Sequence, residues 1–453
     1  MQQNIQAGLE RQREFFRSGA TRSHAFRFQA LDALYETIAG REQAIEAALF
    51  ADMGKSRGES WLTETGIVLA ETGHARKRLK AWMRPRRART PLALFPARSR
   101  IIPEPFGVVL VMAPWNYPLQ LSLVPLINAV AAGNCVVLKP SSRAPATVAV
   151  LEKIINDVFD SRHVRLVQGD AKTGGALLEE RFDFIFYTGS TRVGRTVMEA
   201  AGRGLTPVCL ELGGKSPVIV CADADLELAA RRIAWGKALN AGQTCVAPDY
   251  VLAHQNVKTR LVALLRENFA RFPGPDALHN DRYCRIISGA AMDRLDSLAK
   301  GQAGLDRQTG RMAPLVMPDA RPDDPVMQEE IFGPLLPVLS FSHVDEALGF
   351  VREREKPLAC YVFSRSNEQA RHMMDLLSFG GGCINDTIMH AGSHALPFGG
   401  VGASGMGRYH GKAGFELFSN MKSVVLGSSL VDPPLRYPPY SGWMLALLKR
   451  ILR

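Results

Sequence analysis

The central part of the chain alternates short apolar runs with segments of helical periodicity. Apolar runs bounded by turn residues predict strands at Val108–Ala113, Val136–Lys139, Val164–Gln168 and Phe182–Thr188. Apolar residues that recur with the spacing of one helix face predict helices at Leu119–Ala132, Pro145–Phe159 and Val193–Ala201. This alternation predicts a parallel sheet with helices on both faces, which binds its ligands at the carboxyl ends of the strands.

A second α/β unit is expected from about Val208 onward. Its pattern predicts strands at Val218–Cys221 and Lys356–Ser364, and a helix from Asp225 to about Asn240. The segment Gly301–Asp324 is richer in Gly, Pro, Asp and Arg, which predicts a surface connection. Because 453 residues with 46% hydrophobic content are too many for one simple core, we expect two or three domains.

Both flanks have patterns of their own. Residues Ala25–Trp82 are amphipathic and predict a helical lead-in, after which prolines at 85, 91, 96, 103 and 105 predict an extended stretch. The tail Ser441–Arg453 predicts an amphipathic helix with cations off its apolar face. The residues on that face are Trp443, Met444, Leu447, Leu448, Ile451 and Leu452.

The formal charge of +11 comes from one segment. Residues 76–100 contain ten Lys and Arg and no acid, so the rest of the chain has a charge of only 11 − 10 = +1. This basic stripe is either a solvated face, an anion-attracting surface near a phosphate cofactor or a membrane, or a nucleic-acid patch. No recognition module accompanies it, so we expect no nucleic-acid partner.

Composition also predicts the compartment. No apolar run reaches the ~18 residues of a membrane span, and the first residues lack the features of a signal peptide. The seven cysteines are odd in number and have no CxxC spacing, as expected for free thiols in the cytoplasm. His390 and His394 lie four residues apart without a carboxylate ligand pattern, so no metal site is expected.

One cysteine and one glutamate are the strongest candidates for chemistry. Cys245 ends the segment Asn240-Ala-Gly-Gln-Thr-Cys245, which follows Glu211 by 245 − 211 = 34 residues. A cysteine attacks carbonyl groups only as the thiolate, so it needs a depressed pKa or a nearby base, which Glu211 could supply. On its own, a cysteine in a turn of small residues is more often a packed apolar residue.

The segments around both residues are more informative than either residue alone. Glu211-Leu-Gly-Gly-Lys215 and Gly242-Gln-Thr-Cys245 resemble the two signature segments of the aldehyde dehydrogenase superfamily, at its spacing, and further matches run from about Trp82 to Val425. The further matches are Pro114-Trp-Asn-Tyr-Pro118, Phe186-Tyr-Thr-Gly-Ser-Thr191, Glu330-Ile-Phe-Gly-Pro334 and Leu396-Pro-Phe-Gly-Gly-Val401.

The resemblance implies a division of the α/β chain into a Rossmann-like cofactor domain, an α/β catalytic domain and a small bridging arm that serves oligomerisation. We expect the cofactor domain at residues 1–86 and 106–208 and the catalytic domain at 209–402. The bridging elements are then 87–105 and 403–430, followed by the tail at 431–453.

The resemblance also implies the reaction. Cys245 is expected to add to an aldehyde, Asn116 and the Cys245 N–H to hold the oxyanion, and Glu211 to activate the water that hydrolyses the thioester to the acid. Competing hypotheses are a CoA-acylating or phosphate-linked relative, against which the intact Glu211 segment argues, and a catalytically idle structural member of the fold. Lys215 either tunes Glu211 or forms a surface salt bridge.

The cofactor residues are implied in the same way, for NAD or NADP. The turn with Gly189, Ser190 and Gly194 opens a helix that can bind an anion and is expected beside the diphosphate. Most NAD-preferring relatives have a glutamate where this chain has Ser142, so we expect NADP to be tolerated. The alternative is that Ser142 only caps the helix near Pro145, with Arg143 in solvent. The remaining expected cofactor contacts are Lys139, Leu212, Glu330 and Phe332.

The close spacing, the shortened N-terminus and three segments resemble the class 3 branch of the superfamily: Trp115-Asn-Tyr-Pro118, Ala247-Pro-Asp-Tyr250 and Arg436-Tyr-Pro-Pro439. That branch implies a homodimer that oxidises medium to long aliphatic or aromatic aldehydes, for which Trp115, Tyr117 and Trp235 either line an apolar tunnel or belong to the core. The tail helix docks on its own body or on the partner subunit, as a lid near the substrate entrance, or lies peripherally on an anionic membrane.

Overall fold

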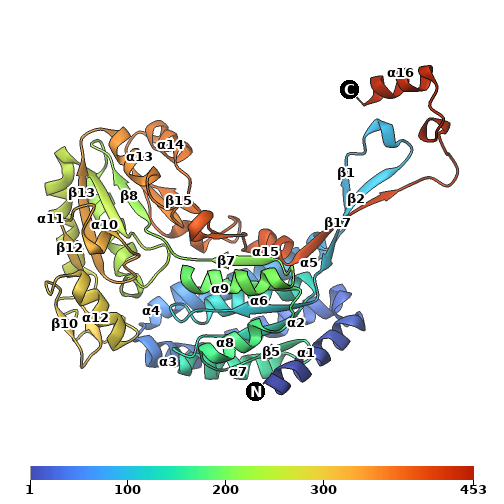
Figure 1. Cartoon of the computed structure of the whole chain (residues 1–453). Helices are drawn as coiled ribbons and strands as arrows, with labels where there is room; N and C mark the ends of the chain where they lie inside the picture. Colours follow the sequence, from blue (N-terminus) through green and yellow to red (C-terminus); the bar gives the residue numbers. More distant parts are fainter. Residues whose placement is uncertain (1, 453) are drawn as a thin grey trace.

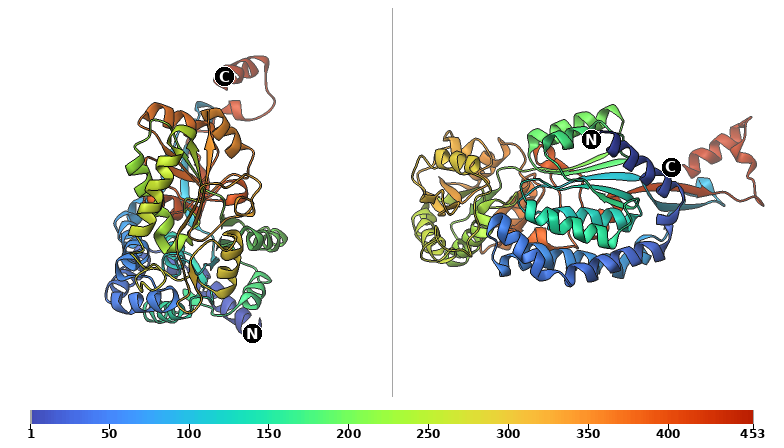
Figure 2. Two further views of the ribbon diagram at one scale, coloured as in Figure 1. Left: turned by 90° about the vertical axis from the view of Figure 1, so that its left-hand side faces the viewer. Right: turned by 90° about the horizontal axis from the view of Figure 1, so that it is seen from below.

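The computed structural model describes residues 2–452, and its N-terminal part is a run of helices along the first sheet (Figures 1 and 2). These are α1 Gln2–Arg17, α2 His24–Ala39, α3 Glu42–Met53, α4 Arg57–Ser60, the π-helical turn η2 Trp61–Thr65 and α5 Gly66–Trp82. The segment predicted to be helical from Ala25 is therefore helical, but it is divided into several helices, and α1 precedes it. Gly54 ends α3 with a φ of 67°, a value that favours glycine.

The first sheet has the strand order β16-β7-β6-β3-β4-β5. Its strands are β3 Val108–Met112, β4 Cys135–Lys139, β5 Val164–Leu166, β6 Phe184–Thr188, β7 Val208–Glu211 and β16 Gly405–Met406. Its helices are α6 Gln120–Ala132, α7 Pro145–Val158, α8 Ala171–Leu178 and α9 Thr191–Arg203. All pairs are parallel except β16 with β7. The predicted strands and helices lie where expected to within two residues, whereas α8 was not predicted.

The second sheet is parallel throughout, with the order β12-β13-β9-β8-β14-β15. Its strands are β8 Pro217–Val220, β9 Tyr250–His254, β12 Leu315–Met317, β13 Leu335–Phe341, β14 Ala359–Phe363 and β15 Gly381–Ile384. Its helices are α10 Leu226–Ala238, α11 Gln255–Arg271, α12 Gly289–Leu298, α13 Val344–Arg352 and α14 Asn367–Leu376. Two parallel sheets confirm the predicted α/β class.

The segment predicted as a surface connection, Gly301–Asp324, is more ordered than expected. It contains the hairpin of β10 Leu305–Asp306 and β11 Arg311–Met312, followed by β12. Met312 is fully buried and Arg311 nearly so. Most of the segment is partly or fully exposed, as predicted for a surface connection, but its strands were not predicted because they are too short to produce a periodic pattern.

An antiparallel arm projects from the body of the molecule (Figure 1). Strand β2 Arg98–Pro105 pairs with β1 Arg86–Ala88 on one side and with β17 Ser419–Leu426 on the other, and the 3₁₀ turn η3 Leu92–Leu94 lies at the tip. The basic residues at positions 84–100 are thus on the arm, while those at 76–80 are on α5. Helix α15 Gly411–Leu417 connects the body to β17.

The tail runs beyond the arm. The 3₁₀ turn η8 Pro434–Arg436 leads to α16 Gly442–Ile451, which contacts η3 and lies far from the two sheets of its own chain (Figure 1). The expectation that the tail docks on its own body as a lid is therefore wrong, because β17 carries the chain out along the arm before the helix begins. Between residues 2 and 452, no helix has the length and apolar character needed to cross a membrane.

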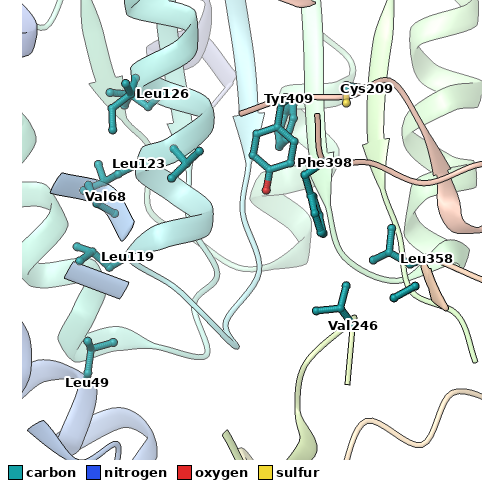
Figure 3. Close-up of a cluster of buried hydrophobic side chains, with 14 of the residues drawn as sticks. Leu49, Val68, Leu119, Leu123, Leu126, Cys209, Val246, Leu358, Phe398 and Tyr409 are labelled. Carbon is teal, nitrogen blue, oxygen red and sulfur yellow. The ribbon is translucent and has the colours of Figure 1, made fainter. Parts of the chain in front are cut away.

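One large apolar cluster joins the two sheets (Figure 3). It includes Leu49 and Val68 from the N-terminal helices, Leu123 from α6, and Val246 and Leu358 from the second half of the chain. All are buried, with exposures of 3% or less. At ~25 cal/mol per Å² of apolar surface removed from water, such burial is the main force that holds the two halves together. The loops that follow the strands are thereby fixed against one another.

Candidate active site

A strained turn carries Cys245. Helix α10 is followed by the 3₁₀ turn η4 Leu239–Gly242, in which Asn240, Ala241 and Gly242 have φ angles of 52°, 50° and 74°. A Cβ atom at 242 would lie 2.2 Å from the carbonyl oxygen of Gly333, so only glycine fits there. Left-handed backbone at non-glycine residues costs about 1–3 kcal/mol each and requires support from its surroundings.

Several hydrogen bonds supply that support. Oε1 of Glu59 accepts from the backbone N–H of Asn240 at 2.6 Å. The side-chain amide of Gln243 donates to the carbonyl oxygens of Asn240, at 3.0 Å, and of Arg285, at 2.9 Å. Its Oε1 accepts from the N–H of Ile287 at 3.0 Å. Gln243 therefore ties the turn to a distant loop, and Cys245 follows in a fixed position.

Cys245 lines an apolar cavity of about 260 Å³ that Glu211 also lines. Burial, followed by the negative charges of Glu330 and Glu211, raises the pKa of Cys245 to about 12. The backbone N–H groups of Cys245 and Val246 act in the opposite direction, with smaller effect. In this state the thiol carries its proton, so attack on a carbonyl requires a base or a nearby positive charge.

Glu211 ends strand β7 and is 2% exposed. Its Oε1 accepts a hydrogen bond from the Cys209 thiol at 3.8 Å, whereas its buried Oε2 has no partner among the described residues. Burial raises the pKa of Glu211 well above its ordinary value, and Cys209 and the charge of Arg408 only partly oppose this effect. A carboxyl group with a raised pKa and a free oxygen in a cavity is suited to general acid–base catalysis.

Asn116 lies in the loop after β3 and is 3% exposed. Its Nδ2 donates to the carbonyl oxygen of Gln243 at 3.1 Å, and an amide nitrogen carries a second hydrogen that can also be donated. Because Gln243 is two residues before Cys245, the Asn116 amide is held beside the backbone that leads to Cys245. Of the three predicted catalytic residues, Cys245 and Glu211 line the cavity, whereas Asn116 lies behind its lining, next to Tyr117.

The cavity wall is mainly apolar, and many of its residues were not predicted. Tyr117 and Trp235 line it, as one of the two sequence interpretations had it, whereas Trp115 lies edge-on to Phe332 at 5.5 Å between ring centroids. Further apolar lining residues are Leu62, Ile67, Leu121, Leu239, Ile388, Met389, Phe398 and Tyr409. They are spread over nearly the whole chain, and no local pattern distinguishes them from core residues.

Helix α9 begins in the turn expected to hold a diphosphate. Ser190 is its exposed N-cap, and Gly194 lies in its first turn. A Cβ at 194 would lie 2.6 Å from Leu212, so glycine lets the helix pack closely on that residue. Gly189 similarly has no room for a Cβ beside the Tyr187 hydroxyl, at 2.2 Å. The exposed N-terminus of this helix provides N–H groups and a positive dipole end.

Lys139 and Ser142 lie at the carboxyl end of β4. The Lys139 ammonium donates to the carbonyl oxygens of Gly169 and Pro140, at 2.8 and 3.2 Å. Ser142 is exposed and does not cap α7, so the capping interpretation is wrong, whereas Arg143 is exposed as that interpretation expected. The carboxylate of Asp52 takes the capping role instead, accepting from the N–H groups of Ala146 and Thr147 at 3.0 and 2.8 Å.

Glu330 and Phe332 belong to a loop that is fixed by an ion pair. Lys215 contacts the Asp249 carboxylate and donates to the carbonyl oxygens of Val326 and Glu329, both at 2.8 Å. Lys215 is therefore neither a surface residue nor a partner of Glu211; it holds the Glu330 loop. Glu330 packs on Gly213, where a Cβ would lie 1.9 Å from its Oε2, and burial raises its pKa to about 8.

All seven cysteines are free thiols. Within the described range, no group of three or more His, Cys, Asp or Glu is arranged to hold a metal ion.

Comparisons with known proteins agree with this geometry. The model of the aldehyde dehydrogenase family matches residues 2–424. The chain is 43% identical over 435 residues to 4,4'-diaponeurosporen-aldehyde dehydrogenase of Staphylococcus aureus, covering 94% of this chain and 95% of that protein. It is 44% identical over 446 residues to aldehyde dehydrogenase family 3 member A2 of Mus musculus, covering 96% and 92%.

Solved structures give the same result. The substrate-bound state of Staphylococcus aureus AldH superposes with a TM-score of 0.95 and 41% identity, covering 99% of both chains. The NAD⁺ complex of aldehyde dehydrogenase from Bacillus cereus superposes with a TM-score of 0.86 and 25% identity, covering 94% of this chain and 89% of that one.

Proposed function

Because this chain belongs to the aldehyde dehydrogenase family and is an NAD(P)-dependent oxidoreductase of the aldehyde group, we propose that Cys245 is its nucleophile, Glu211 its general base and Asn116 its oxyanion donor. The observation that carries this proposal is the shared cavity: a thiol and a carboxyl group, one oxygen of which has no hydrogen-bond partner among the described residues, line the same apolar space. Two such groups can form and then hydrolyse a thioester.

In the first half-reaction the Cys245 thiol loses its proton to water, and its sulfur bonds to the carbonyl carbon. The carbonyl electron pair moves to oxygen, where the Asn116 amide and the Cys245 N–H hold the resulting oxyanion. When bound, the oxidised nicotinamide supplies a hydride acceptor and a positive charge. A positive charge near Cys245 opposes the charges of Glu330 and Glu211, which lowers the thiol pKa.

In the second half-reaction Cys245 holds the acyl group as a thioester. Glu211 takes a proton from water, and the water oxygen bonds to the acyl carbon. The same donors hold the second oxyanion, and the carbon–sulfur bond then breaks to release the acid. Glu211 is suited to this step because its raised pKa makes it a stronger base than an ordinary carboxylate.

The residues near the α9 N-terminus fit a nicotinamide dinucleotide. We propose that Gly189, Ser190 and Gly194 contact the diphosphate, and that Lys139 and Ser142 contact the adenosine ribose. Leu212, Glu330 and Phe332 are proposed to contact the nicotinamide end. Support comes from the exposed helix N-terminus, the missing side chains at the glycines and the half-buried Glu330, whose carboxyl group lacks a cation at hydrogen-bond distance among the described residues.

The apolar wall favours medium or long aliphatic aldehydes, or aromatic ones. Each methylene group buried against residues such as Leu121 and Ile388 contributes about 0.8 kcal/mol. Leu62 and Met389 line the same cavity and are 56% and 58% exposed, so they mark where it opens to solvent. The Staphylococcus aureus relative is named for 4,4'-diaponeurosporen-aldehyde, which supports an aldehyde as the substrate.

We propose that the enzyme is a cytoplasmic homodimer. Free thiols at all seven cysteines support a reducing compartment. The arm supports dimerisation, because β17 leaves one edge unpaired among the described strands and Val425 and Leu426 are half exposed there. The domain division expected from the sequence stays a proposal: residues 1–86 and 106–208, 209–402, and the bridging elements 87–105 and 403–430.

The tail is proposed to contact an anionic membrane surface peripherally. Trp443 and Leu445 of α16 are 64% and 48% exposed beside the cations Lys449 and Arg450. The neighbouring η3 exposes Leu92, and the arm around it is rich in arginine. Apolar side chains among cations are the surface that an anionic bilayer attracts.

The catalytic proposal is tested by variants at both residues. Cys245→Ala should abolish oxidation of hexanal and benzaldehyde while the dissociation constant for the cofactor changes little. Glu211→Gln should slow steady-state turnover by about 10²–10⁴ but keep a rapid burst of reduced cofactor, because only thioester hydrolysis is impaired.

Controls separate the chemistry from the fold. Cys221→Ala changes a cysteine that is buried against Met373 and outside the cavity, so it should retain near-normal rates. Near-normal turnover in Cys245→Ala would exclude the nucleophile assignment. A burst lost together with turnover in Glu211→Gln would show that Glu211 acts before, rather than in, thioester hydrolysis.

A further inference from the structure

A buried ion pair lies behind Asn116. The ammonium of Lys55 donates to Oε1 of Glu64 at 2.6 Å, and both side chains have no exposed surface. Lys55 lies between α3 and α4, and Glu64 is in the π-helical turn η2. A buried pair of this kind contributes little net stability compared with apolar residues of the same size, because desolvation offsets the attraction. A role other than stability is therefore needed to explain why this ion pair lies in the interior.

Lys55 donates its second hydrogen bond to the site itself. Its ammonium lies 2.9 Å from the carbonyl oxygen of Asn116 and 4.0 Å from the centre of the Tyr117 ring. The same carbonyl oxygen accepts from the side-chain amide of Asn240 at 3.0 Å. Two donors, one of them charged, thus fix the peptide between Asn116 and Tyr117. Charge-assisted hydrogen bonds of this kind are about twice as strong as neutral ones.

Glu64 fixes the other side of the same loop. Its Oε2 accepts from the backbone N–H groups of Leu119 and Gln120, at 3.0 and 2.9 Å, at the start of α6. The Tyr117 hydroxyl is hydrogen-bonded to Thr244 Oγ1 at 2.5 Å, next to the nucleophile. Residues 116 to 120 are therefore held at both ends by one ion pair. The π-helical turn contributes to this arrangement, since its extra residue directs Glu64 inward while its neighbours Leu62 and Thr63 line the cavity.

We propose that Lys55, neutralised by Glu64, is a positioning residue that holds the Asn116 amide at the place where the oxyanion forms. The charged pair is retained because an oxyanion donor must be preorganised to within a few tenths of an ångström to stabilise the transition state. This inference rests on the proposed role of Asn116. Lys55 itself does not touch the substrate; it acts through the Asn116 backbone.

The test compares two variants of the full-length enzyme with cofactor bound. Glu64→Gln removes the negative charge but keeps the Lys55 ammonium and the acceptor for the α6 N–H groups. The double variant Lys55→Met/Glu64→Gln also removes the ammonium, so both proteins avoid the isolated Glu64 carboxylate that Lys55→Met alone would create. Glu59, whose pKa burial raises and the charge of Lys55 lowers, is unchanged in both variants. Lys153→Met, on the exposed face of α7, is the matched control for loss of a lysine.

The decisive readout is the rate of the burst of reduced cofactor in a single turnover of hexanal. The double variant should be about tenfold to a hundredfold slower than Glu64→Gln, approaching the ~10²–10³ expected when the oxyanion donor itself is removed. Alkylation of Cys245 by iodoacetamide forms no oxyanion. Its rate and the cofactor dissociation constant should therefore remain within about twofold of Glu64→Gln.

A double-mutant cycle identifies the route of the effect. Asn116→Ala should slow the burst on its own, and in that background the further loss of Lys55 should have little additional effect. If Asn116→Ala leaves the burst unchanged, the proposed role of Asn116 fails. If Asn116→Ala slows the burst but Lys55→Met/Glu64→Gln matches Glu64→Gln, the inference about Lys55 alone is overturned. If the loss of Lys55 slows the burst equally with Asn116 present and with Asn116→Ala, or slows alkylation of Cys245 to the same extent, the role of Lys55 is purely structural and the inference is overturned.

Discussion

The thiol of Cys209 donates a hydrogen bond to the Glu211 carboxylate, with Sγ and Oε1 3.8 Å apart. Both side chains are buried, and a Cβ at Gly407 would lie 2.6 Å from the same sulfur, so the thiol has little freedom to move. This bond lowers the pKa of Glu211 against the larger, opposite effect of burial. Cys209 therefore influences how much of the proposed base is ionised at a given pH.

We expect substitution of Cys209 to shift the pH dependence of thioester hydrolysis. Hydrolysis should accelerate as the pH rises through the pKa of Glu211, because the base acts when ionised. Cys209→Ala removes the donor and should move the profile to higher pH. Cys209→Ser provides a stronger donor and should move it to lower pH, each by up to about one pH unit, or ~1.4 kcal/mol.

The measurement is steady-state turnover from pH 6 to 9 under conditions in which hydrolysis limits the rate. Cys221→Ala, which removes a buried thiol elsewhere, should leave the profile unchanged. Identical profiles for Cys209→Ala, Cys209→Ser and the parent enzyme would mean that the thiol does not affect the base.

Glu71 should make the folded state less stable as the pH rises. Burial raises its pKa to about 7 from an ordinary value near 4.5, although the N–H of Gly411 donates to its Oε1 at 2.7 Å. The folded protein therefore retains a proton that the unfolded chain has lost. The contribution of this proton to the free energy of unfolding is fully present below about pH 4.5. As the pH rises to about 7 it is lost, which lowers the free energy of unfolding by on the order of 3 kcal/mol.

Glu71→Gln keeps the acceptor but cannot ionise. We expect its urea denaturation midpoint to exceed that of the parent enzyme at pH 8 and to converge with it near pH 5. Glu355→Gln, at an exposed position, is the control and should follow the parent at both pH values. A constant offset between Glu71→Gln and the parent across the range would rule out titration of Glu71 as the cause.

Cofactor preference should depend on Ser142. An uncharged, exposed side chain there does not repel a 2′-phosphate, so we expect kcat/KM for NADP to lie within about tenfold of that for NAD, or ~1.4 kcal/mol. Ser142→Glu should move the preference toward NAD. Ser161→Glu adds the same charge before β5, at the other end of the sheet, and should not. A thousandfold preference for NAD in the parent enzyme would contradict this role of Ser142.

The tail should govern membrane binding. We expect the parent enzyme to float with vesicles that contain phosphatidylglycerol, and deletion of residues 441–453 to reduce this binding. Lys449→Glu and Arg450→Glu should each weaken it by at least about fivefold, since one cation near an anionic surface contributes about 1 kcal/mol. Light scattering on the same samples supplies the control for oligomeric state. Dissociation of a dimer after the deletion, with flotation unchanged, would indicate a subunit interface instead.

The amino-acid sequence determined the elements whose signal is local. Strands such as β3 and β4 are continuous apolar runs because both faces of a parallel sheet are covered, and their carboxyl ends are where the candidate residues Asn116 and Lys139 follow. The segments around Cys245 and Glu211 indicated the family and the reaction. None of these inferences requires knowing which distant residues meet.

Only the tertiary structure decided how those residues are held. Lys55 donates to Asn116, which lies 61 positions later in the sequence. Asp52, rather than Ser142, caps α7 by accepting from the N–H of Ala146, 94 positions later. Lys215 donates to carbonyl oxygens of the Glu330 loop that lie 111 or more positions later in the sequence. The tail likewise lies beside η3 only because β17 pairs along β2. Periodicity and turn chemistry report on neighbours within about two helical turns, whereas buried hydrogen bonds and ion pairs form wherever packing of the core brings polar groups together.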